Sequence, residues 1–288
     1  MENHNKPPQD IRTTVREHYG QIAESFQPAS SSGCGCAPQS SACCSSDGSA
    51  QLINLEQTLS LYQTSEVADL PVEVTGLSLG CGDPITLASL QPGQSVLDLG
   101  SGGGIDCFLA AKRVGPSGRV IGVDMTPAML EKARSNQVKI GLQNVEFRLG
   151  EIEHLPVADA SIDVIISNCV INLSPDKPQV FREAYRVLRP GGRLAVSDIV
   201  TNGPLDPTIK SSLSAWAGCI AGALEVDEYL AAIQEAGFVD VSLTPVYMDH
   251  AMIDEAIAQL GDTVDLSQVP QESLYHSVFS AKITARKS

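Results

Sequence analysis

Between residues 95 and 199, apolar runs typical of strands alternate with apolar spacings typical of helices, and this alternation limits the folds that the chain can adopt. Apolar runs of strand length recur there, at residues 95–99, 119–124, 145–149, 162–167 and 193–199. Segments with apolar residues at helical spacing separate several of these runs. Strands that alternate with helices form parallel β-α-β units, which bind ligands beyond the carboxyl ends of their strands. The pattern therefore predicts an α/β fold with a central, mostly parallel sheet flanked by helices.

Turn and capping residues indicate where two of the helices begin and end. Thr126 and Pro127 follow the second strand, where Thr126 is suited to be the N-cap of a helix and Pro127 its first residue. Gly141 is suited to the left-handed conformation just past the end of the same helix. A helix predicted at residues 179–188 ends before residues 189–192, which contain a proline and two glycines. A fifth strand is expected directly afterwards.

The two ends of the chain differ from this central part. Residues 11–26 carry apolar groups at helical spacing and predict a short amphipathic helix. Residues 27–50 contain serine, glycine, alanine, proline and four cysteines but no large apolar side chains, so the segment is predicted to be flexible. Beyond residue 202 the pattern loosens into helices near residues 208–221 and 226–236 and strands near 239–248 and 276–285.

These patterns predict three regions. Residues 1–50 form an N-terminal helix with a flexible cysteine-rich segment, residues 51–202 form the ligand-binding domain, and residues 203–288 form a smaller C-terminal α+β lobe.

Charge and cysteine content narrow the functional classes. The formal net charge of −15 argues against nucleic acid and anionic membrane as partners, because both need clustered basic residues. The polar N-terminus does not resemble a signal peptide, and no apolar run approaches the roughly 20 residues of a membrane helix. We therefore expect a cytoplasmic protein, in which eight cysteines indicate soft-ligand or redox chemistry more than a disulfide framework.

A glycine-rich turn joins the first predicted strand to the helix that follows it. A dinucleotide fingerprint that starts at Gly100 would need glycine at position 105, where this chain has Ile105. The spacing Asp98-x-Gly100-x-Gly102-x-Gly104 instead resembles the first motif of class I methyltransferases that use S-adenosylmethionine. This resemblance implies a Rossmann-like class I methyltransferase fold, with residues 51–202 as the cofactor-binding domain. A purely structural glycine turn is the alternative.

Further positions match the cofactor site of that family. Asp124 ends the second strand, where a carboxylate accepts hydrogen bonds from ribose hydroxyls. The resemblance implies that Glu151 receives the adenine amino group, that Ile152 packs on the ring and that Asn168 faces the methionine moiety. The complete expected cofactor set is Asp98, Gly100, Ser101, Gly102, Asp124, Met125, Glu151, Ile152 and Asn168.

Three cysteines stand where a methyltransferase handles its acceptor. Cys169 follows Asn168 at the end of the fourth strand, Cys219 lies on an Ala- and Gly-rich segment, and Cys81 stands between two glycines. Several soft ligands suggest a soft acceptor. With these motifs, residues 78–223 resemble the bacterial type of arsenite S-adenosylmethionine methyltransferase. The resemblance implies that the three thiolates bind trivalent arsenic, whose lone pair attacks the sulfonium methyl without a general base.

The cysteines also have other interpretations. Cys169 and Cys219, each taken alone, could be small core residues, and Cys107 is interpreted as packing within a helix. In the family, a further N-terminal cysteine forms a transient disulfide with the counterpart of Cys81. Here, Cys43 and Cys44 are the favoured candidates among the four tail thiols. The tail could instead capture metalloid, or carry spare thiols.

The sequence therefore predicts an arsenite methyltransferase that produces mono- and dimethylated arsenic for detoxification, with trimethylated product left open. Reduced thioredoxin or a small thiol is the expected reductant. One alternative is a methyltransferase for a small organic acceptor such as a quinone or a sterol. The other is a non-catalytic, thiol-rich metalloid-binding protein.

Overall fold

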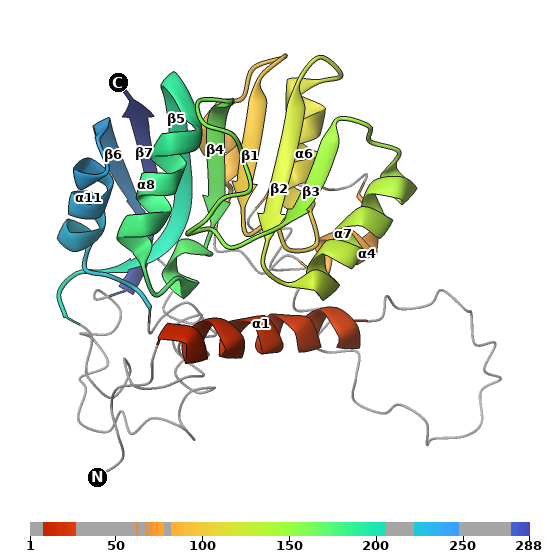
Figure 1. Ribbon diagram of the computed structural model, residues 1–288, viewed down its shortest axis with the longest axis horizontal. Coiled ribbons are helices and arrows are strands. Elements are labelled where there is room, and N and C mark those ends of the chain that lie inside the picture. Colours follow the sequence, from red (N-terminus) through yellow and green to blue (C-terminus); the bar gives the residue numbers. More distant parts are fainter. Residues whose placement is uncertain are drawn as a thin grey trace, which may run out of the picture.

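A single seven-stranded sheet forms the centre of the molecule (Figure 1). The computed structural model describes residues 8–26, 62, 67, 70–77, 82–204, 222–247 and 278–288. The strands are ordered β3-β2-β1-β4-β5-β7-β6, and the five that come first in the sequence are parallel. This arrangement confirms the predicted α/β class I methyltransferase fold.

The strand bounds lie close to the predicted ones. The strands are β1 Ser95–Leu99, β2 Arg119–Asp124, β3 Val145–Leu149, β4 Ile162–Asn168, β5 Leu188–Thr201, β6 Phe238–Val246 and β7 Val278–Lys287. The described helices are α1 Pro8–Ser25, α4 Val72–Thr75, α5 Pro84–Ala88, α6 Ile105–Val114, α7 Pro127–Ile140, η1 Ile171–Leu173, α8 Lys177–Val187 and α11 Val226–Glu235. The helix expected near residues 208–221 lies outside the described residues.

Helices cover both faces of the sheet because successive strand residues point to opposite sides. Leu97 of β1 packs in a core cluster with α8 and α11, whereas its neighbour Val96 packs in a second cluster with α5, α6 and α7. The edge-on pair of Phe181 and Tyr229, with ring centroids 5.4 Å apart, joins α8 to α11. Both faces are therefore buried, as parallel sheets require.

One local prediction needs correction, and another is confirmed with a different hydrogen bond from the one expected of an N-cap. Residues 189–192 do not form a separate loop before the fifth strand, because β5 begins at Leu188, which pairs with Ile162. The register then shifts between Ile162 and Val164, so the proline and glycines form an irregularity within the strand. Thr126 is the N-cap residue of α7, but its hydroxyl makes no capping hydrogen bond; its backbone N–H instead donates to Asp124 Oδ1 (2.8 Å).

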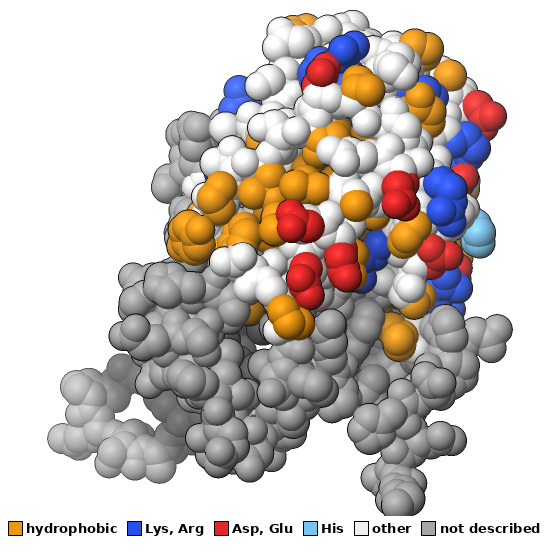
Figure 2. Space-filling model, turned by 90° about the vertical axis from the view of Figure 1, so that its left-hand side faces the viewer, with side chains coloured by type: hydrophobic (Ala, Val, Ile, Leu, Met, Phe, Trp, Pro, Cys, Tyr) orange, Lys and Arg blue, Asp and Glu red, His pale blue; other side chains and the backbone are white. Residues whose placement is uncertain are grey.

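The strands β6 and β7 extend the same sheet instead of forming one of their own. β7 pairs antiparallel with β5, and β6 pairs antiparallel with β7 at the edge. Figure 2 faces this edge and shows hydrophobic side chains gathered on it, among which Val239, Val246 and Tyr247 are exposed. The division of the chain at residue 203 remains a prediction.

The helix α1 lies across the carboxyl ends of the parallel strands (Figure 1). Val15 and Ala23 on its inner face are buried, whereas Arg16 and Glu17 are exposed. Phe26, at its end, packs so closely on Gly76 that a Cβ there would come within 2.6 Å of the Phe26 ring. Among the described helices, we find none with the length and apolar character needed to cross a membrane.

Candidate functional site

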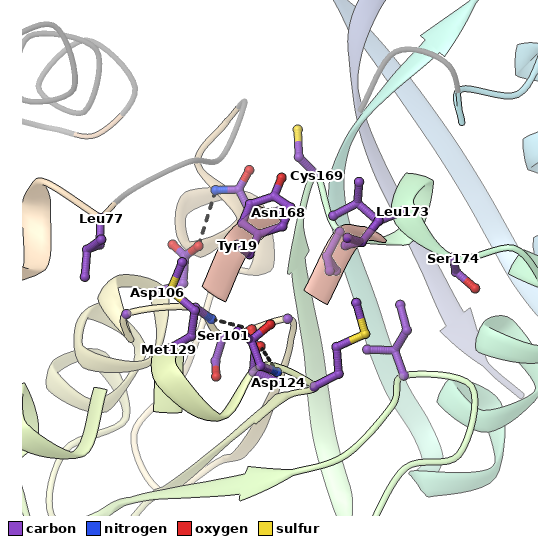
Figure 3. Close-up of a pocket in the computed structure, with 18 of the residues that line it drawn as sticks. Tyr19, Leu77, Ser101, Asp106, Asp124, Met129, Asn168, Cys169, Leu173 and Ser174 are labelled. Carbon is purple, nitrogen blue, oxygen red and sulfur yellow. Dashed lines mark hydrogen bonds between the residues drawn. The ribbon is translucent and has the colours of Figure 1, made fainter. Parts of the chain in front are cut away.

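A cavity opens between α1 and the carboxyl ends of β1, β2 and β4 (Figure 3). Its walls come from the glycine turn after β1, the end of β2, the segment after β3 and the residues that follow β4. Three residues of α1, namely Arg12, Val15 and Tyr19, line it from the other side. It therefore lies where parallel α/β sheets bind ligands.

The turn between β1 and α6 brings backbone rather than side chains to this cavity. Gly100, Gly102 and Gly104 all have positive φ angles, of 70°, 48° and 95°. A Cβ at Gly100 would lie 2.2 Å from Cγ2 of Val170, so no larger residue fits there without a shift. Gly100, Ser101 and Gly102, three of the residues predicted to bind the cofactor, line the cavity, and the buried Ser101 hydroxyl has no hydrogen-bond partner among the described residues.

Asp124 holds the glycine turn against the end of β2. Its carboxylate accepts hydrogen bonds from the backbone N–H of Gly102 (2.9 Å) and of Thr126 (2.8 Å). Burial raises the pKa of Asp124, and these two N–H donors oppose the shift. Asp124 and Met125 both line the cavity, in agreement with their predicted positions.

Asp98 lies beneath the cavity instead of lining it. It is buried and accepts a hydrogen bond from the thiol of Cys107 (Sγ to Oδ2, 3.2 Å). Burial, followed by the nearby Asp106 carboxylate, raises the pKa of Asp98. The Asp98 side chain therefore contacts α6 through Cys107, and its expected contact with the cofactor stays a prediction. Cys107 is a buried free cysteine within α6, as predicted.

The segment after β3 contributes an apolar residue and a carboxylate. Ile152 and Glu153 line the cavity, but Glu151 does not; its carboxylate lies 3.7 Å from the Arg12 guanidinium and is partly exposed. Glu153 is buried and accepts hydrogen bonds from Arg12 (3.2 Å) and from the hydroxyl of Ser174 (2.6 Å). The acidic residue that faces the cavity is thus Glu153 rather than the predicted Glu151.

A network of side chains surrounds Asn168 at the end of β4. Asn168 Nδ2 donates to Asp106 Oδ2 (3.3 Å) and to Tyr62 Oη (3.1 Å), and Tyr62 Oη donates to Asp106 Oδ1 (2.9 Å). The same amide is also bonded to the backbone of Gly82 through both its nitrogen (2.8 Å) and its oxygen (3.2 Å). Burial raises the pKa of Asp106 to about 7. All three side chains of the network line the cavity.

Cys169 lies next to this network and lines the same cavity; in Figure 3 its side chain stands beside Asn168 and its sulfur points away from Ser101 and Asp124. Its φ angle of 60° is unusual for a residue with a side chain, and its N–H donates to the carbonyl of Ser197 (2.8 Å). Its sulfur is disulfide-bonded, whereas Cys107 is free.

The other predicted site cysteines, Cys81, Cys219, Cys43 and Cys44, lie outside the described residues. Within the described part of the chain, no three His, Cys, Asp or Glu side chains form a group that could hold a metal ion.

Sequence reasoning missed several residues that line this cavity. Asp106 had a signal, because it is an acidic residue among apolar residues in the first turn of the helix that directly follows the glycine turn. Tyr19 was assigned to the apolar face of α1 without a role at the site. Tyr62 lies far from the other site residues in the sequence, and no periodic pattern marks it.

Comparison with known proteins gives concordant matches. A family model described as "Methyltransferase domain" matches residues 90–237. An arsenite methyltransferase of Halobacterium salinarum is 48% identical over 244 residues, which cover 83% of this chain and 60% of that protein. An arsenite methyltransferase of Aquipseudomonas alcaligenes is 37% identical over 263 residues, which cover 88% of this chain and 69% of that protein. The chain thus spans about 60% of the length of the Halobacterium relative.

A solved structure resembles the chain as well. The crystal structure of CrArsM, an arsenic(III) S-adenosylmethionine methyltransferase from Chlamydomonas reinhardtii, superposes with a TM-score of 0.62 at 37% sequence identity. The match covers 78% of this chain and 72% of that one.

Proposed function

Because the chain belongs to the arsenite methyltransferase family, we propose that it transfers methyl groups from S-adenosylmethionine to trivalent arsenic bound by cysteine thiolates. The observation that carries the proposal is the position of Cys169, which lines the cofactor cavity directly beside Asn168 and is disulfide-bonded to a second cysteine. Reduction of this disulfide frees the thiolate of Cys169, which is a soft ligand for arsenic.

The cavity has features that fit S-adenosylmethionine. The turn at Gly100 leaves no room for a side chain, and the buried Ser101 hydroxyl is available for a polar group of a ligand. We propose that this turn and the Asp106–Asn168 pair hold the amino-acid end of the cofactor. Asp124 would accept from the ribose hydroxyls, and Ile152 would pack on the adenine.

In the proposed reaction, the arsenic lone pair forms the As–C bond while the C–S bond of the sulfonium breaks. The electron pair of that bond stays on sulfur, which leaves S-adenosylhomocysteine. Two thiolates then supply two electrons to the oxidised arsenic and couple as a disulfide, which an external thiol reduces. No proton leaves the nucleophile, so the protein acts mainly by positioning, an effect worth roughly 7–11 kcal/mol when the geometry is favourable.

The remaining parts of the proposal concern residues and partners beyond the described structure. We propose Cys81 and Cys219 as the other arsenic ligands, Cys43 or Cys44 as the redox thiol, and thioredoxin or a small thiol as the reductant. A reducing compartment such as the cytoplasm would keep these thiols available.

Replacement of one thiol tests the proposal. Cys169→Ser should abolish arsenite methylation while cofactor binding changes little, because the hydroxyl is a poor ligand for arsenic but nearly isosteric with the thiol. The matched control is Cys107→Ser, which keeps a donor for Asp98 outside the cavity and should retain methylation. Arsenic speciation after incubation with arsenite, S-adenosylmethionine and a thiol gives the rate, and calorimetry gives the cofactor affinity. Unchanged methylation by Cys169→Ser would rule out Cys169 as a ligand.

A further inference from the structure

Cys169 belongs to a buried apolar cluster that separate elements of the chain build around it. The cluster contains Val15 of α1, Leu173 of η1, Ile199 of β5 and Ala223, with exposed fractions of 2%, 8%, 8% and 3%. Val15 and Leu173 also line the cavity that Cys169 lines, and Figure 3 shows Leu173 near Cys169. The sulfur proposed to bind arsenic therefore shares a chamber with aliphatic side chains.

The position of Val15 is well defined. It lies three residues after Arg12 on α1, and Arg12 is bonded to the buried Glu153 across the cavity (3.2 Å). The other wall is also fixed, since the side chain of Asn172, next to Leu173, donates to the carbonyl of Ile199 (2.6 Å). The chamber thus has two walls, one from α1 and one from the segment after β4, and each is anchored by a side-chain hydrogen bond or ion pair.

Successive methyl transfers change what this chamber must hold. Each cycle of transfer and reduction adds one methyl group to arsenic and releases a thiolate ligand, so the bound species becomes more apolar. An apolar wall favours contact with such methyl groups, but a closely packed chamber resists extra volume. The space between the two walls should therefore affect the binding of methylated arsenic differently from that of arsenic without methyl groups, because the methyl groups are apolar and occupy volume.

We propose that Val15 and Leu173 form the surface that receives arsenic-bound methyl groups and thereby determine how readily the second methyl group is added. The inference rests on the proposed function and deepens it, because it assigns the methylation stage to two aliphatic residues outside the thiolate set.

The test compares two rates for each variant at saturating S-adenosylmethionine and thiol: methylation of arsenite and methylation of methylarsenite. Their ratio cancels any general loss of activity that a change in α1 causes. Val15→Leu narrows the chamber and should lower the methylarsenite-to-arsenite rate ratio about fivefold or more, as expected for overpacking. Val15→Ala removes two methyl groups and widens the chamber, and it should raise the ratio about threefold or more.

A variant of the opposite wall and a matched control complete the design. Leu173→Val should act like Val15→Ala and raise the ratio about threefold. Val138 is an 81% exposed valine of α7, so Val138→Leu and Val138→Ala should leave the ratio unchanged. Equal ratios in all variants, or a shift in the same direction for Val15→Leu and Val15→Ala, would overturn the inference. If the unaltered protein binds S-adenosylmethionine but methylates neither arsenical, the proposed function is wrong instead.

Discussion

Asp106 lies in the first turn of α6, where its carboxylate is buried and accepts hydrogen bonds from Tyr62 and Asn168. Burial raises its pKa to about 7, the two hydrogen bonds oppose the shift, and the charge of Asp83 adds to it. Near neutral pH this carboxyl group therefore gains or loses a proton readily. A cation bound beside it would favour the charged form.

The affinity for S-adenosylmethionine should therefore depend on pH through Asp106. Below about pH 7 the carboxyl group is protonated, so pairing with the ammonium group of the cofactor's amino-acid end must release a proton. Affinity should fall as pH is lowered through this value, by up to about tenfold per pH unit. Calorimetry at pH 5.5, 6.5 and 7.5 measures the slope.

Asp106→Asn provides the control, because it keeps the shape of the side chain but cannot titrate. It should bind the cofactor more weakly at pH 7.5 and with a flatter pH dependence. If the cofactor affinity of this variant depends on pH as steeply as that of the unaltered protein, another group titrates. Asp106 would then not be the residue that binds the ammonium group of the cofactor.

At the scale of elements, α1 closes the cavity and is attached to the rest of the molecule by polar and apolar contacts. Arg12 contacts the carboxylates of Glu153 and Glu151, and Lys132 of α7 donates to the carbonyl of Phe26 (3.4 Å). Val15 and Tyr19 add apolar contacts. A helix attached in this way over a binding site can open more readily than the core of the sheet.

Arg12→Ala should loosen α1 and weaken cofactor binding. The guanidinium is about a quarter exposed, so we expect a loss of only about 1 kcal/mol, which is roughly fivefold in affinity. Hydrogen exchange of the α1 peptides should become faster, while exchange in β1 and β4 stays slow. Arg16→Ala, an exposed position on the same helix, serves as the control. Equal exchange rates in the two variants would show that the Arg12 ion pairs do not hold the helix.

At the scale of the whole molecule, a buried polar cluster joins three elements behind the site. Asp198 of β5 accepts hydrogen bonds from the Tyr229 hydroxyl of α11 (3.0 Å) and from the N–H of Ile199 (3.0 Å). Lys177 of α8 donates to the carbonyls of Asn172 and Ser174, which follow Cys169 in the chain. Burial raises the pKa of Asp198 to about 7, although Tyr229 and Lys177 oppose the shift.

This cluster predicts how the free energy of unfolding varies with pH. The pKa of Asp198 is about 7 in the folded protein and lies near 3.8 when the chain is unfolded. The folded state therefore binds more protons between these values, so the stabilisation is complete below the lower one and is lost as pH rises towards 7. Urea unfolding at pH 5 and pH 7.5 should show a larger loss of stability for the unaltered protein than for Asp198→Asn. An identical loss in both would exclude Asp198 as the source.

Local patterns were sufficient for the elements of the central sheet and for part of the site. The strands from Ser95 to Thr201, the left-handed end of α7 at Gly141 and the amphipathic face of α1 all follow from residues adjacent in sequence. The glycine turn and Asp124 were predictable for the same reason, because they directly follow buried strands. Periodicity and turn chemistry act over a few residues, so one sequence reveals them.

Contacts between distant segments decided the rest. The antiparallel pairing of β7 with β5, the position of α1 over the strand ends and the meeting of Tyr62 with Asp106 and Asn168 each join residues far apart in the chain. The same holds for Asp98, which the fold turns away from the cavity towards Cys107. The sequence by itself determined the order of strands, helices and the cofactor turn, because these depend on local conformation. Only the tertiary structure decided which side chains face Cys169, because packing of the whole sheet sets those distances.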